Sequence, residues 1–189
     1  TAISASHAVL AQTFFIITIV IAYSLSLERE RRESWPEATN PGFLRMIFVL
    51  GALIYVQLIL GALMRHTESG LAIPDFPTMG GYWIPPFDDA MLRHINDWRF
   101  EHDLPMVNMA QVMIHFVHRA GAVLIAVTVG LLDVVAVREK IKDKAVVWTI
   151  LALNALIIFQ VFLGIVTVLS QKSPHITSTH VMTGAATLG

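Results

Sequence analysis

The 189-residue chain contains no cysteine. This absence excludes disulfides, thiolate ligation of haem iron, covalent c-type haem attachment and iron–sulfur clusters, because all of these need cysteine sulfur. Charge is also scarce: 14% of the residues are charged, whereas a typical soluble domain has about 25%. With a net charge of −1 and no basic patch outside the loop ends, the composition argues against a nucleic-acid partner.

Hydrophobic residues make up 55% of the chain and gather in long apolar segments. A helix of about 20 apolar residues crosses the core of a bilayer, and the first four segments are long enough to span it. The fifth has 15 residues and is expected to be a helix that is cut short at its end. The pattern predicts an all-α integral membrane protein with five transmembrane helices. These cover residues 3–27, 43–64, 105–137, 145–170 and 175 onward. Pro105 suits the first turn of the third helix, where its missing N–H costs nothing.

The loops between these segments predict an orientation. Residues 28–42 and 138–144 carry the dense positive charge, which places them on the cytoplasmic side. The long loop 65–104 then lies on the outer, periplasmic side, where the first, third and fifth segments begin. Within that loop, residues 88–103 predict a short surface helix. Its apolar side is formed by Met91, Leu92, Ile95 and Trp98.

Each of the three segments that begin on the outer side carries a histidine near its start: His7, His118 and His180. At 1.5 Å rise per residue, His180 lies roughly 8 Å and His118 roughly 9 Å into its apolar segment. Ionisable residues at such depth are costly and usually functional. His115 lies three residues before His118, on a neighbouring face, and is interpreted as a packing or supporting residue.

The chain also repeats itself. Residues 3–7 (ISASH) match residues 176–180 (ITSTH), and residues 57–61 (QLILG) match residues 160–164 (QVFLG). Internal repeats in membrane proteins commonly indicate two related halves. The first segment is therefore interpreted as the last helix of one half, with three more helices expected upstream. Residues 43–189 form a complete four-helix half.

These features favour a haem held by two histidines. Such a site needs imidazoles from two facing helices at matched depth, with small residues where the macrocycle lies. Small residues follow the histidines by four positions, at Ala11, Ala122 and Gly184. We expect His118 and His180 to bind one haem. His7 would be half of a second site whose other half is not in this chain.

Cations near the outer interface would pair with the haem propionates. The candidates are Arg65, Arg119 and Lys172. The simpler alternative is that the histidines only form hydrogen bonds between helices, as polar residues in membranes often do. The repeat favours haem, because it places three imidazoles at one level.

Residues 61–77 (GALMRHTESGLAIPDFP) resemble the loop signature of the haem A synthase family. In that family a Gly-rich helix end leads into Arg-x-Thr-x-Ser-Gly-Leu and then Pro-Asp-Trp/Phe-Pro. The His118–Arg119 pair and the Thr177-to-His180 motif follow in the same order. The loop motif is specific, whereas His-Arg alone is weak. The resemblance covers essentially the whole chain, as the last helix of the family's first half plus its second half.

The resemblance implies an eight-helix oxidoreductase built from two pseudo-symmetric four-helix bundles. Members of the family convert haem O to haem A, for cytochrome oxidase, by oxidising a ring methyl to a formyl group. It implies that residues 43–189 hold haem b between His118 and His180. Residues 1–27 would be the last helix of the substrate-haem half, with His7 as a ligand. The family's catalytic glutamate belongs to helices outside this chain, so the catalytic residue here is unknown.

The resemblance also implies partners and a location. Haem O and haem A, membrane lipid, haem O synthase and cytochrome oxidase assembly factors are the expected partners, and the cell inner membrane is the expected location. The sequence leaves open the electron donor and whether the protein forms a homo-oligomer. The alternative function is a di-haem b-type cytochrome that carries electrons to or from quinone, and a haem-free transporter is a third. The loop signature of residues 65–77 favours the synthase.

Overall fold

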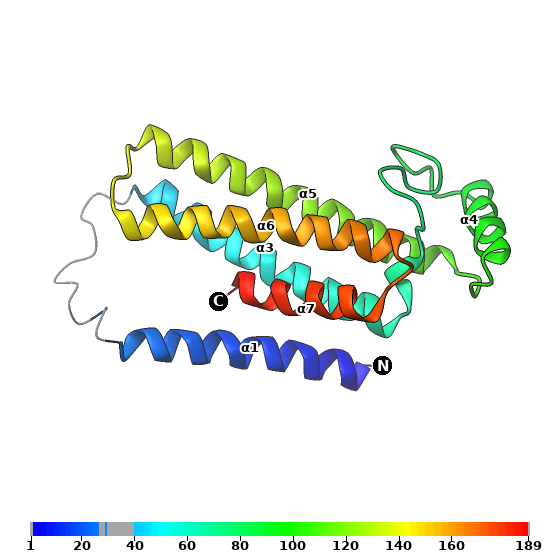
Figure 1. Ribbon diagram of the computed structural model, residues 1–189, viewed down its shortest axis with the longest axis horizontal. Coiled ribbons are helices and arrows are strands. Elements are labelled where there is room, and N and C mark those ends of the chain that lie inside the picture. Colours follow the sequence, from blue (N-terminus) through cyan, green and yellow to red (C-terminus); the bar gives the residue numbers. More distant parts are fainter. Residues whose placement is uncertain (1, 27–28, 30–39, 189) are drawn as a thin grey trace.

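A computed structural model describes residues 2–26, 29 and 40–188 of the chain. Five longer helices run along one axis: α1 (Ala2–Ser24), α3 (Pro41–His66), α5 (Met109–Arg138), α6 (Lys144–Leu169) and α7 (Pro174–Leu188) (Figure 1). The long loop holds a 3-10 turn, η1 (Ser69–Leu71), and a short helix, α4 (Asp89–Glu101). Within these ranges the chain is helix and loop apart from an isolated Met79–Tyr82 bridge.

The expected class, an all-α integral membrane protein, is confirmed. Helices α3, α5 and α6 are each long and apolar enough to cross a membrane. The apolar part of α1, Val9–Ser24, is shorter, and α7 has 15 residues. The outward faces of the long helices carry exposed large apolar side chains such as Phe48, Ile158 and Phe162, which suits contact with lipid.

Helices α3, α5, α6 and α7 form a closed four-helix arrangement. The closest pairs are α3 with α5 and α6 with α7, and contacts of α3 with α7 and of α5 with α6 complete the ring. Helices α5 and α7 therefore stand diagonally opposite each other. Helix α1 lies beside α3, where a 2.7 Å hydrogen bond joins the hydroxyls of Thr13 and Tyr55.

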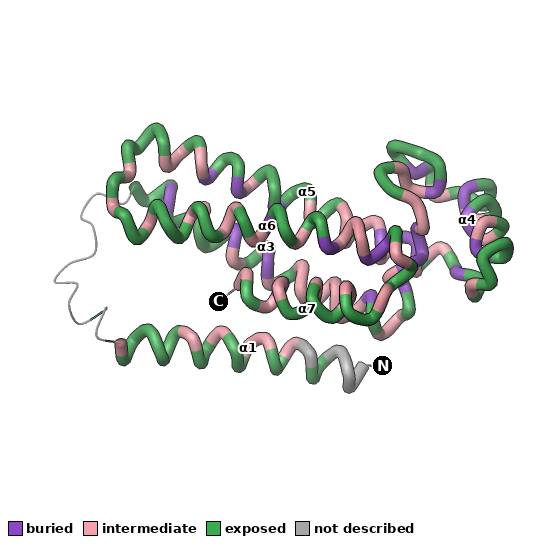
Figure 2. Tube along the Cα trace, in the orientation of Figure 1, coloured by how far each residue is buried: buried purple, intermediate pink, exposed green. Residues whose placement is uncertain are grey.

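The long loop marks one end of the bundle, which we call the loop end. Helices α1, α5 and α7 begin at the loop end, and α3 and α6 finish there (Figure 1). The three helices that carry His7, His118 and His180 thus start from the same end, as the sequence predicts. Figure 2 shows that burial gathers in the bundle interior and around the loop.

The buried apolar residues form two clusters. One fills the bundle away from the loop end and comprises Phe43, Leu50, Ile54, Ile125, Val129, Leu132 and Ile157. The other joins the loop to the start of α5 and comprises Ala72, Ile73, Met91, Ile95, Val107 and Val112.

Helix α4 confirms the short helix expected in the loop. The Asp88 carboxylate caps it by accepting a 2.8 Å hydrogen bond from the Met91 amide. Met91, Ile95 and Arg99 follow one another at four-residue spacing and are all buried. The buried Arg99 guanidinium donates hydrogen bonds to the backbone carbonyls of Leu71 and Pro105. These bonds hold α4 against η1.

The expected start of the third span at Pro105 is wrong. Helix α5 begins four residues later, at Met109, where Asn108 and Gln111 form a reciprocal capping box. The Pro105 carbonyl instead accepts a 2.7 Å hydrogen bond from Arg99. The contact with α4 therefore holds this stretch outside the helix.

Candidate functional site

His118 projects from α5 onto the backbone of α3. A Cβ atom added at Gly61 would stand 3.4 Å from its Cε1 atom, so the imidazole lies directly against the glycine. The Nδ1 atom of His118 is buried and has no hydrogen-bond partner among the described residues. A buried nitrogen without a partner is costly, and such a group needs an explanation in function or in a missing ligand.

His180 repeats this arrangement in the second helix pair. Its imidazole, carried by α7, lies against Gly164 of α6, with a Cε1 atom 3.4 Å from the position of an added Cβ. Its Nδ1 atom is also buried without a partner among the described residues. The two histidines therefore occupy equivalent positions in related helix pairs.

A glutamine side chain fixes the backbone at each histidine. The Gln57 amide of α3 donates a 2.8 Å hydrogen bond to the carbonyl of His118, and the Gln160 amide of α6 donates one of 2.9 Å to the carbonyl of His180. The glutamines precede the glycines of the same helices by four residues, one helical turn.

A second pair of glycines makes room for the glutamines. A Cβ at Gly121 would overlap the Gln57 side-chain oxygen, and one at Gly184 would stand 2.7 Å from the Gln160 side-chain nitrogen. Only glycine fits at such a close approach without displacing the amide. Each helix pair therefore carries the same unit of Gln, Gly, His and Gly.

His118 and His180 are carried by the diagonally opposite helices α5 and α7. Among the residues that the structure describes, no three His, Cys, Asp or Glu side chains group to hold a metal ion. Two imidazoles alone suit a metal whose remaining ligands come from a macrocycle. A glycine beside each ring lets the imidazole lie close to the neighbouring helix, and the two histidines would hold such a group from diagonally opposite helices.

His115 is buried one turn before Arg119 and belongs to a different contact. Its Nδ1 atom accepts a 3.0 Å hydrogen bond from the backbone amide of Ile73. This bond places the ring proton on Nε2. The approach of the Arg119 Nε atom to Nε2, at 3.2 Å, is therefore a close polar contact between two donors. His115 fastens the loop to α5.

Arg119 holds the same loop more extensively. Its guanidinium donates hydrogen bonds to three loop carbonyls, those of Ile73 at 3.2 Å, Asp75 at 2.8 Å and Thr78 at 3.2 Å. It also lies 6.0 Å from the centre of the Phe76 ring, within cation–π range. We call this set of contacts from His115 and Arg119 the loop clasp. The sequence predicted a haem propionate as the partner of Arg119 and gave no sign of these loop carbonyls.

Asp75 organises the loop beyond the clasp. Its carboxylate accepts backbone hydrogen bonds from Gly80 at 2.7 Å and Gly81 at 2.9 Å, both of which have positive φ angles. Burial raises the pKa of Asp75, but hydrogen bonds from Thr78 and these two amides outweigh that effect and hold the pKa below its usual value. The Pro-Asp-Phe-Pro run followed by Gly-Gly was the sequence signal for this turn.

The other expected site residues lie apart from this arrangement. Arg65 is exposed near the end of α3, and His7 is exposed on α1. Lys172 is exposed in the turn between α6 and α7, and its stem lies beside Gly70 of η1.

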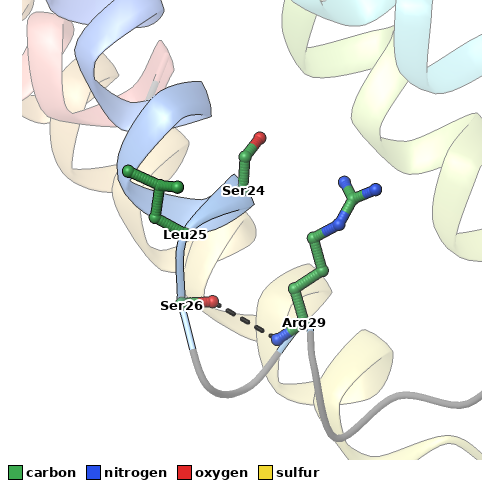
Figure 3. A pocket seen from close by; sticks show the side chains of 4 residues that line it. All are labelled: Ser24, Leu25, Ser26 and Arg29. Atoms are coloured by element: carbon green, nitrogen blue, oxygen red, sulfur yellow. Dashed lines mark hydrogen bonds between the residues drawn. The ribbon is translucent and has the colours of Figure 1, made fainter.

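A cavity of about 290 Å³ lies elsewhere, at the opposite end of α1 from His7 (Figure 3). It is lined by Ser24, Leu25, Ser26 and Arg29. The Arg29 backbone amide donates a 3.3 Å hydrogen bond to the Ser26 hydroxyl. None of these side chains is a haem or metal ligand, so the cavity is separate from the histidine site.

Comparisons with known proteins give a consistent result. The family model described as cytochrome oxidase assembly protein, COX15-CtaA, matches residues 1–189. The chain is 25% identical to the heme A synthase of Halalkalibacterium halodurans over 182 residues, covering 94% of this chain and 54% of that protein. It is 30% identical to the heme A synthase of Mesorhizobium japonicum over 176 residues, covering 93% and 44%. The chain spans about half the length of the curated relatives it matches.

Proposed function

The chain belongs to the cytochrome oxidase assembly protein family, and we propose that it is the haem b-holding part of a haem A synthase. The reaction of the whole protein would be the oxidation of a ring methyl of haem O to the formyl group of haem A. The curated relatives that carry this name support the proposal, as does the loop signature of residues 65–77.

The observation that carries the proposal is the paired environment of His118 and His180. These histidines would be the two axial ligands of haem b, one from each diagonal helix. Gly61 and Gly164 let each imidazole approach its neighbouring helix closely. Gln57 and Gln160 hold the backbone at each ligand, so the protein positions the rings before any haem arrives. Haem b would supply one-electron transfer.

Two cations would lie near the propionates in this proposal. Arg119 already donates to three loop carbonyls and approaches His115, which leaves one N–H of its five for a propionate. Arg65 is exposed near the end of α3 and keeps its side chain available at the surface.

The substrate haem would lie in a second half of the protein. Residues 1–27 would be the last helix of that half, with His7 as one ligand. The exposure of His7 in this structure suits a ligand whose haem and facing helix lie outside the chain. The catalytic residue would also lie outside it.

The protein would reside in the cell inner membrane. Loops 28–42 and 138–144 would be cytoplasmic and loop 65–104 periplasmic, by the distribution of Lys and Arg. Haem O synthase and cytochrome oxidase assembly factors would be its partners in supplying haem O and receiving haem A.

The test is the pigment of the purified whole protein, in which this chain is joined to the half proposed to hold the substrate haem. We expect a bis-histidine haem b spectrum together with extractable haem O or haem A. His118→Ala and His180→Ala should each remove the haem b spectrum, whereas His102→Ala, at an exposed position on the loop, should keep it. Haem b without haem O or haem A would instead indicate a di-haem b-type electron carrier. Absence of haem from the native protein would contradict both functions.

A further inference from the structure

The tip of the long loop is apolar and exposed. Met79 and Tyr82 pair across a Gly80–Gly81 turn, and Trp83 and Ile84 follow directly. The side chains of Trp83 and Ile84 are 73% and 86% exposed, and Tyr82 is also exposed. Such large apolar side chains at a turn are unusual when water surrounds them, because polar residues normally occupy turns.

Contacts on both sides of the tip fix its place against α5. Before the tip, Arg119 holds the loop carbonyls of Ile73, Asp75 and Thr78. After it, the Phe87 ring packs edge-on against Phe116 of α5, with ring centres 5.0 Å apart. The tip therefore lies between two loop residues, Thr78 and Phe87, that contact Arg119 and Phe116 of α5.

This part of α5 lies near the boundary of its apolar segment. Phe116 comes seven residues after the first residue of α5, about 10 Å along the helix. Figure 1 shows the loop curling back beside α5 at the level where α6 ends, while α4 lies farther out. Val117, the residue after Phe116, is exposed on the outward surface of α5. The loop on both sides of the tip therefore contacts a part of α5 that also carries an exposed apolar side chain.

We propose that Tyr82, Trp83 and Ile84 enter the boundary between lipid headgroups and acyl chains and anchor the loop to the membrane. The Trp N–H and Tyr hydroxyl suit the polar side of this layer, and their rings and Ile84 suit the apolar side. Residues 79–87 (MGGYWIPPF) contain no charged residue that would oppose entry. The loop is then held twice, by the clasp on α5 and by lipid at its tip.

A nitroxide label at the tip can test this, because the chain has no native cysteine and a single introduced cysteine is labelled uniquely. The full chain with Ile84→Cys is labelled and reconstituted in phosphatidylcholine–phosphatidylglycerol vesicles. Oxygen, which concentrates in acyl chains, and a water-soluble nickel chelate serve as collision partners in power-saturation EPR. Phe162→Cys, at an exposed position on α6, is the lipid control. Glu101→Cys, at the exposed end of α4, is the water control.

The label at position 84 should collide with oxygen several-fold more, relative to nickel, than the label at position 101. Its depth should be shallower than at position 162. Adding Tyr82→Ser and Trp83→Ser to Ile84→Cys should move the label toward the water control. A value at position 84 equal to that at 101 would overturn the proposal, and so would a label that neither reagent reaches. Trp83→Cys provides a second labelled position, for which the same result is expected.

Discussion

The two helix pairs of the bundle share one unit and differ in one addition. The α3–α5 pair and the α6–α7 pair each place a histidine against a glycine, with a glutamine bonded to the histidine carbonyl. The α3–α5 pair alone adds the loop clasp of His115 and Arg119. At the matching positions, α7 has Thr177 and the exposed Val181. The Thr177 hydroxyl donates a hydrogen bond to the backbone carbonyl of Ser173, directly before α7.

This difference separates two tasks. The shared unit supports the two histidines that we propose as ligands, and each histidine has the same hydrogen bond to its backbone carbonyl. The clasp holds the long loop, and residues near the start of one helix, α5, make all of its contacts. Substitutions in the shared unit should therefore have matching effects in the two pairs, whereas substitutions in the clasp should affect one pair alone.

Removal of either histidine should have the largest effect of the substitutions considered, a loss of the haem spectrum. This loss should be equal for the two helix pairs. In the proposed site, His118→Ala and His180→Ala would each remove one axial ligand, so the low-spin bis-histidine spectrum should fall to background in both. Optical and EPR spectra of the purified variants measure this. Retention of the spectrum in one variant alone would show that the two positions are not equivalent ligands.

Arg119→Lys should affect the loop and leave the second pair unchanged. A lysine ammonium cannot reach three carbonyls in the fixed geometry of a guanidinium. Loss of these bonds should cost about 1–3 kcal/mol in local stability, the cost of leaving buried polar groups unpaired. Limited proteolysis within loop 65–104 measures the change, with Arg93→Lys, exposed on α4, as the control. If the rate of loop proteolysis stays unchanged and haem is lost, the main partner of Arg119 is a haem propionate instead.

Gly121→Ala and Gly184→Ala should weaken the two pairs alike. Each new Cβ displaces a glutamine amide and breaks its bond to the histidine carbonyl. We expect a loss of about 1 kcal/mol each, the typical net value of one hydrogen bond. Gly130→Ala is the matched control on α5, because nothing lies within 4 Å of its Cβ position. Thermal unfolding in detergent, followed by circular dichroism, compares the three. A loss in Gly130→Ala as large as in the other two would contradict the argument.

Low pH should lower the local stability of the loop, by less than the substitutions above. The pKa of Asp75 is lower in the folded loop than its unperturbed value of 3.8. The carboxylate therefore contributes stability above the unfolded pKa, and this contribution is lost as the pH falls through the folded pKa. Proteolysis of the loop by pepsin across pH 2–5 should show this dependence, and Asp75→Asn should remove it. The same dependence in Asp75→Asn would assign it to other groups. Asp97→Asn, at an exposed position on α4, is the control.

The sequence predicted the helices better than the contacts between loop and bundle. Apolar length and the positions of charged residues were enough to find the five long helices, and the repeat pointed to the two equivalent histidines. Arg119 and Arg99 were harder to interpret, because each bonds to backbone carbonyls far away in the chain. Every residue has a backbone carbonyl, so the residue type does not show which carbonyl will accept a hydrogen bond. The helix start predicted at Pro105 was wrong for the same reason, because the Pro105 carbonyl accepts a hydrogen bond from Arg99.

The diagonal placement of α5 and α7 has a consequence for assembly. These helices mainly contact α3 and α6 rather than each other, so a haem bound by both would act as a crosslink through the middle of the bundle. Any ligand that binds the native state alone stabilises it by mass action. With haem bound as proposed, the protein would be more stable with its pigment than without it, and the gain would grow with the concentration of free haem.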